Sequence, residues 1–267
     1  MPHFSYDGQR IGYESRGPVD AAARPFVLVH GLLFSRMHHY GLADALAERG
    51  NQLILIDLLG HGTSDKPVHA RHYTMEIFGR QVVALLDHLD IGGAVIGGTS
   101  LGANVALEVA ANASPRCRAL FIEMPVLERA IPAAALLFVP LTIVSAEAAG
   151  PLEAIARLVR KIPRGHFLYS DVMLELLSRD PRTSAAVLHG LLSGRIAPHQ
   201  SDREKIDART LIMGHQRDLL HPLSDAEALH RELPNSELMR SSSFFELRFP
   251  PNRLSDRIAD FLDEVWS

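Results

Sequence analysis

The sequence contains the pattern G-x-S-x-G at residues 98–102, with Ser100 as its serine. The pattern comes directly after the apolar run 94–96 and directly before a run of helical spacing. On a tight turn from strand to helix a serine hydroxyl is exposed, and glycines on either side let other backbone pass close to it. The start of the helix also favours negative charge that develops during acyl transfer. The pattern therefore predicts that Ser100 is a nucleophile.

Two other uses of these glycines do not fit. A phosphate-binding loop requires G-x-x-x-x-G-K-[ST], but Ala-Asn follows at 103–104. A dinucleotide-binding turn requires G-x-G-x-x-G, which is missing, although Glu123 is placed where its acidic residue would lie. His69 and His72 have the spacing H-x-x-H, but no cysteine or carboxylate cluster accompanies them. The sequence predicts neither a cofactor nor a metal.

Short apolar runs alternate with longer runs of helical spacing along most of the chain. Because the expected strands are continuous apolar runs, this alternation predicts an α/β fold: a mostly parallel sheet with helices on both faces. Residues 4–6 and 11–14, joined through Asp7-Gly8, predict an antiparallel hairpin at the sheet edge. The expected strands are 26–30, 53–56, 94–96, 119–122, 210–213 and 236–240, and the expected helices are 37–49, 74–89, 100–111 and 251–266.

The strand pattern disappears between residues 126 and 205, where helical spacing recurs in short segments. We therefore expect a core formed by residues 1–125 and 206–267, with a helical insertion at 126–205. The apolar stretch 130–144 is interrupted by Pro132 and Pro140 and is shorter than the ~20 residues that a membrane-spanning helix needs. No membrane span is predicted.

Composition excludes several classes of protein. The chain has 267 residues, 47% hydrophobic and 22% charged, with a net charge of −4, which excludes a disordered chain and allows a large core. The slight acidity argues against a nucleic-acid partner, which needs a basic face. A single cysteine, Cys117, excludes an internal disulfide framework. The first residues lack the pattern of a targeting segment, so we expect a cytoplasmic protein.

Further motifs lie around Ser100 in chain order. His30-Gly31 follows one strand, D-L-L-G-H-G-T-S-D occupies 57–65, and G-H-Q-R-D occupies 214–218. Together with Ser100 these motifs resemble the α/β-hydrolase family over nearly the whole chain. The resemblance implies the α/β-hydrolase fold, with the helical insertion in the position of the family's cap.

The resemblance also implies roles for particular residues. Ser100 matches the family's nucleophile and Asp218 its acid. The backbone N–H groups of Leu32 and Leu101 correspond to the oxyanion hole. Relatives that act on halides or epoxides carry a carboxylate where this chain has Ser100, which argues against those reactions.

The family's catalytic histidine is missing from its usual place. It normally follows the last strand, in a segment like G-H-x-P, but residues 241–250 contain no histidine. Ser243-Phe244 occupy the expected Gly-His position. Without a base the serine hydroxyl is a poor nucleophile at neutral pH. Either another histidine reaches Ser100 or the protein is not a conventional hydrolase.

The chain has 14 histidines, and His221 is the favoured substitute because it lies three residues after Asp218. His61 is expected to be structural, and Glu246 to be a surface charge paired with Arg248. The other candidates are His215 near the strand end, His38 and His39 after the oxyanion loop, and His166, His189 and His199 in the insertion.

Two hypotheses follow. In the first, the protein hydrolyses an ester or thioester of a small, apolar or acyl-containing substrate, using Ser100, Asp218 and His221. In the second, it is a degenerate hydrolase that binds a small apolar ligand or performs non-hydrolytic chemistry in the same pocket. Phe244 at the usual histidine position motivates the second hypothesis.

Overall fold

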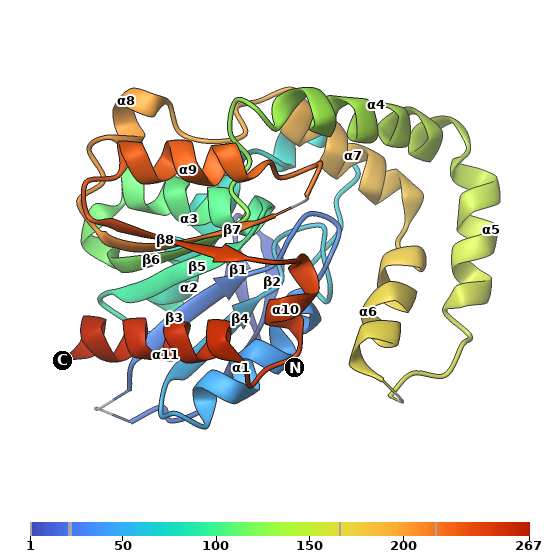
Figure 1. Ribbon diagram of the computed structural model, residues 1–267. Helices are drawn as coiled ribbons and strands as arrows, with labels where there is room; N and C mark the ends of the chain where they lie inside the picture. Colours follow the sequence, from blue (N-terminus) through green and yellow to red (C-terminus); the bar gives the residue numbers. More distant parts are fainter. Residues whose placement is uncertain (1, 21–22, 166, 217) are drawn as a thin grey trace.

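Eight strands form one sheet in the order β1–β2–β4–β3–β5–β6–β7–β8 (Figure 1). The pairs β1–β2 and β2–β4 are antiparallel, and all other neighbours in the order are parallel. The computed structural model describes residues 2–20, 23–165, 167–216 and 218–267. The strands are β1 (His3–Tyr6), β2 (Gln9–Arg16), β3 (Pro25–Val29), β4 (Gln52–Ile56), β5 (Ala94–Thr99), β6 (Cys117–Glu123), β7 (Arg209–His215) and β8 (Ser236–Ser241).

Helices cover both faces of this sheet, which is therefore the middle of three layers (Figure 1). Side chains alternate across β3: Val27 and Val29 enter one core, whereas Phe26 and Leu28 enter the other. The first core packs against α2 (Met75–His88), α3 (Leu101–Asn112) and α9 (Leu223–Glu232), and the second against α1 (Tyr40–Ala47) and α11 (Arg253–Trp266).

The predicted fold class is confirmed: the sheet is mostly parallel, helices flank it, and the first two strands form the expected antiparallel hairpin. The helix expected at 37–49 is different in detail. It begins as a 3₁₀ turn, η1 (Arg36–His39), capped by the Ser35 side chain, and only then becomes α1. Gly50, with a φ of 85°, closes the turn that ends it. Two further short 3₁₀ turns are η2 (Ala70–His72) and η3 (Ser114–Arg116).

The described residues between β6 and β7 form five helices. They are α4 (Ile131–Glu147), α5 (Ala149–Val159), α6 (Leu168–Leu177), α7 (Pro181–Leu192) and α8 (Gln200–Arg203). In Figure 1, α4, α5 and α6 form an arch that stands away from the layered core. No single helix in the described ranges is long and apolar enough to cross a membrane; α4 and α5 together reach the required length and composition, but the pair is bent by 93°.

Pro132 and Pro140, which interrupt the apolar stretch 130–144 in the sequence, do not end the helix: α4 runs through both of them. Pro132 lies in the first turn, where a backbone N–H would have no partner inside the helix. Pro140 removes a hydrogen bond in the interior of the helix, but α4 is largely exposed there, so water can bind the freed carbonyl group.

Candidate active site

Ser100 lies on a strained turn between β5 and α3. Its φ of 56° and ψ of −110° are unusual for a residue with a side chain. The Ser100 N–H donates a hydrogen bond of 2.8 Å to the Glu123 carbonyl, which fixes the turn to the end of β6. A Cβ on Gly98 would lie 2.2 Å from the Val29 carbonyl oxygen, and one on Gly102 would lie 2.0 Å from it. The glycines are therefore required by the close approach of β3.

His221 lies between Ser100 and Asp218. Its Nε2 is 2.8 Å from Ser100 Oγ, and its Nδ1 is 2.9 Å from Asp218 Oδ2. Burial alone would raise the pKa of Asp218, but the hydrogen bonds and charge of His221 outweigh burial and lower that pKa. Because an ionised carboxylate only accepts hydrogen bonds, Nδ1 carries the proton and Nε2 is free to accept the Ser100 hydroxyl proton.

The loop after β7 brings these two side chains together through its own hydrogen bonds. Asp218 Oδ1 accepts the backbone N–H groups of Leu220 and His221, at 2.9 and 3.0 Å, as in an Asx turn. Pro222 then precedes the first residue of α9. One carboxylate thus shapes the loop with one oxygen and orients the imidazole with the other. Arg217, within the predicted acid segment, is outside the described residues.

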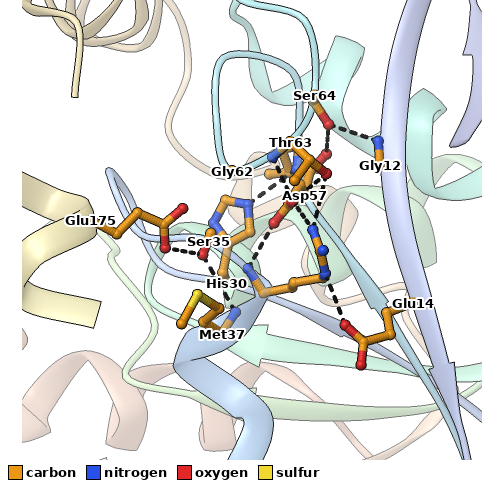
Figure 2. Close-up of polar contacts among 12 residues, drawn as sticks. Gly12, Glu14, His30, Ser35, Met37, Asp57, Gly62, Thr63, Ser64 and Glu175 are labelled. Carbon is orange, nitrogen blue, oxygen red and sulfur yellow. Dashed lines mark hydrogen bonds and ion pairs between the residues drawn. The ribbon is translucent and has the colours of Figure 1, made fainter. Parts of the chain in front are cut away.

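The loop that follows β3 carries Leu32 and is held in place by the buried Asp57, whose polar contacts are drawn in Figure 2. Asp57 accepts the backbone N–H of Arg36 at 2.8 Å and also pairs with its guanidinium group. The Thr63 N–H donates to the same carboxylate at 2.8 Å. Figure 2 also shows Ser35 of this loop hydrogen-bonded to Glu175 of α6. The backbone near Leu32 is therefore anchored on two sides.

Leu32, Ser100 and Leu101 line one pocket, so the structure brings both predicted oxyanion-hole residues next to the serine. Leu101 is the first residue of α3, where backbone N–H groups have no partner earlier in the helix. Such groups suit a developing negative charge. Among the described residues, no group of three or more histidine, cysteine, aspartate or glutamate side chains is arranged to hold a metal ion.

The segment after β8 holds an arginine that pairs with a buried carboxylate. Phe244 begins a short helix, α10 (Phe244–Arg248), and the Arg248 guanidinium lies 4.4 Å from the centre of its ring. Arg248 Nη2 is 2.5 Å from both carboxylate oxygens of the fully buried Glu123. Thr99, which precedes Ser100, donates a hydrogen bond to Glu123 as well. Burial alone would raise the pKa of Glu123, but Arg248 and His215 lower it well below its usual range.

The other candidate histidines do not approach Ser100 in this way. His215 Nε2 is 3.0 Å from Glu123 Oε1, beneath the site. His38 and His39 are buried, and burial, followed by the charge of Arg248, lowers the pKa of each. His61 accepts the Leu33 N–H at 3.3 Å, a structural contact. His189 and His199 are exposed on the surface, and His166 is outside the described residues.

The expectation that Glu246 pairs with Arg248 is wrong. Glu246 accepts hydrogen bonds from Ser241 and Ser242 and lies 2.6 Å from Arg253. Arg248 turns inward instead because Glu123 is buried and needs a partner of opposite charge. The sequence signal for this pair is a glutamate at the end of the buried strand β6.

Most of the chain matches a known protein family. A model of the alpha/beta hydrolase fold family matches residues 24–243. An uncharacterised protein of Mycobacterium tuberculosis is 25% identical over 276 aligned residues, covering 94% of this chain and 79% of that protein. A haloalkane dehalogenase of Mycolicibacterium paratuberculosis is 28% identical over 128 residues, covering 47% of this chain and 42% of the dehalogenase.

Solved structures resemble the chain over almost its full length. A thermophilic esterase from Thermogutta terrifontis has a TM-score of 0.77 and 22% identity, covering 99% of this chain and 97% of its own. A hydrolase from Pseudomonas aeruginosa has a TM-score of 0.80 and 19% identity, covering 98% and 97%. At these identities the likeness establishes the fold and leaves the substrate open.

Proposed function

Because the chain belongs to the alpha/beta hydrolase fold family, we propose that it is a serine hydrolase that cleaves an ester or thioester of a small molecule. The observation that carries this proposal is the hydrogen-bonded line from Ser100 through His221 to Asp218. It supports this proposal over a degenerate hydrolase, because an imidazole lies within hydrogen-bond distance of Ser100 Oγ. The helices of residues 126–205 act as a cap over the site.

The proposed reaction has two halves. Ser100 Oγ attacks the acyl carbon while His221 Nε2 takes the hydroxyl proton, and the Leu32 and Leu101 N–H groups stabilise the resulting oxyanion. His221 then gives the proton to the leaving oxygen or sulfur, which departs. Water attacks the acyl-enzyme, His221 takes a proton from it, and returns that proton to Ser100 as the acid leaves. Asp218 keeps the imidazole oriented throughout.

A fluorophosphonate probe tests the proposal, because it reacts with an activated serine and makes no demand on the substrate. We expect the probe to label the wild-type protein, and Ser100→Ala to abolish labelling. His221→Ala should slow labelling by at least about a hundredfold, since general-base assistance contributes 10²–10⁴-fold. His189→Ala, which changes an exposed histidine on α7, is the matched control. Unchanged labelling in His221→Ala would refute the assignment of the base.

A further inference from the structure

Two pockets meet at Ser100 and differ in size and composition. Both are lined by Leu32, Ser100 and Phe138. We call the first the inner pocket; it encloses about 80 Å³ and lies beneath α4 and α7. We call the second the outer pocket; it encloses about 380 Å³. Apolar side chains, among them Leu188, Leu191 and Leu192 of α7, also line the inner pocket.

His221 lines the outer pocket and is not among the residues that line the inner pocket. In ester cleavage the base that activates the serine also protonates the leaving oxygen, which must therefore lie beside His221 Nε2. We propose that the leaving group occupies the outer pocket and the acyl group the inner pocket, so that the enzyme prefers esters of a short acyl chain with a bulky, uncharged aromatic alcohol. This assignment rests on the proposed function.

The inner pocket suits a short alkyl chain. Among the described residues that line it, Asn104 is the only polar side chain besides Ser100. The Asn104 amide is already hydrogen-bonded: its nitrogen donates to the carbonyls of Val126 and Ile196, at 2.7 and 2.6 Å, and its oxygen accepts the Val126 N–H. The volume of the inner pocket is roughly half of the ~150 Å³ of an engineered cavity that admits benzene. An acyl chain of about two to four carbons fits such a space.

The outer pocket has an aromatic wall. The rings of Phe34 and His38 are stacked with centroids 4.8 Å apart, and His38 and Phe244 are stacked at 5.6 Å. Burial keeps the His38 imidazole neutral by lowering its pKa. Of the described residues that line the outer pocket, Asp218 is the only carboxylate, and His221 pairs with it. A flat, uncharged group therefore matches this wall by stacking.

Two series of esters test the two halves of the assignment separately. With p-nitrophenyl esters the leaving group is constant, and kcat/KM should fall by about 10- to 200-fold from butyrate to octanoate. Leu192→Ala, which enlarges the inner pocket at a half-exposed position, should raise the octanoate-to-butyrate ratio about tenfold. Leu177→Ala, an exposed leucine on α6 outside both pockets, should leave the ratio unchanged.

With acetate esters the acyl group is constant. We expect benzyl acetate to be preferred over ethyl acetate, and Phe34→Ala and Phe244→Ala each to reduce this preference about three- to tenfold. Phe245→Ala changes the exposed neighbour of Phe244 and is the control. Phe34→Ala keeps the test valid if Phe244→Ala fails to fold.

The outcomes distinguish the inference from the proposed function. If the probe labels Ser100 but octanoate is cleaved as fast as butyrate, or if Phe34→Ala and Phe244→Ala leave the benzyl preference intact, the pocket assignment is overturned and the serine hydrolase stands. If Ser100 is not labelled and no ester is cleaved, both are overturned.

Discussion

The segments that follow β7 and β8 lie side by side at the same edge of the sheet but have opposite characters. The β7 loop holds Asp218 and His221 half-buried and hydrogen-bonded in line with Ser100. The β8 segment holds Phe244 and Arg248, and Arg248 forms a buried ion pair with Glu123. In the proposed function the first segment supplies the base, whereas Glu123, the partner of the second, holds the Ser100 turn through hydrogen bonds from Thr99 and the Ser100 N–H. With His221 as the proposed base, the segment after β8 is free to pack around this ion pair.

Placing a histidine at position 244 in a variant that lacks His221 tests this comparison most strongly. His221→Ala should reduce kcat/KM for p-nitrophenyl butyrate by about 10⁴- to 10⁶-fold, as loss of a triad base does in a serine protease. Adding Phe244→His should not restore activity. A histidine at position 244 would lie against the Arg248 guanidinium, which opposes the protonated imidazole that the reaction needs. Phe244→His alone should not raise activity either.

Steady-state kinetics of the two single variants and the double variant measure this prediction, with Phe245→His as the matched control. Recovery of even a hundredfold in the double variant would contradict it. Such a recovery would mean that the β8 segment still provides a competent site for the base.

The sequence was informative wherever function depends on local geometry. The turn at Ser100 was predictable because Gly98 and Gly102 must be small for β3 to approach. Asp218 and His221 were predictable as a pair because His221 follows Asp218 by three residues. The contact of His221 with Ser100 was not predictable, because 121 residues separate the two in the sequence.

The sequence was less informative wherever a side chain's direction depends on distant residues. His215 seemed a possible base until its burial against Glu123 was known. Proximity in the sequence predicts that Arg248 pairs with Glu246, two residues before it, but Arg248 pairs with Glu123. The burial of the Glu123 carboxylate at the end of β6, which requires Arg248 as its partner, is a property of the assembled sheet.

The structural character of the β8 segment predicts a large loss of stability in Arg248→Met. The substitution leaves Glu123 buried without its cation, which should lower the free energy of unfolding by about 3–5 kcal/mol. Glu123→Gln in the same background should recover part of this loss, because it removes the unpaired charge. Urea denaturation at pH 7.5 measures both effects. Arg253→Met, at an exposed ion pair with Glu246, is the control and should cost at most about 1 kcal/mol.

A smaller effect concerns pH and the buried imidazoles beside the β8 segment. Burial and, second, the charge of Arg248 lower the pKa of His38, and they lower that of His39 to about 3. The unfolded chain protonates these groups near pH 6.5, so below that pH it binds more protons than the folded protein. Their contribution to stability is therefore complete above pH 6.5. It is lost as pH falls, by up to about 1.4 kcal/mol per pH unit for each imidazole.

His38→Phe isolates one of these contributions. Phenylalanine keeps the stack between Phe34 and Phe244 but removes two buried nitrogens that have no hydrogen-bond partner among the described residues. At pH 7.5 the variant should be about 1 kcal/mol more stable, because those nitrogens no longer lose hydration on folding. The stability difference between the variant and the wild type should grow as pH falls to 5, because the unfolded variant has one imidazole fewer to protonate. Urea denaturation at several pH values measures this growth, and an unchanged m-value shows that the unfolded ensemble is the same. Parallel stability curves for the variant and the wild type would mean that His38 takes up its proton in the folded protein as well. The difference between the β7 loop, which is proposed to exchange protons, and the groups packed beside the β8 segment, which are not, would then not hold for His38.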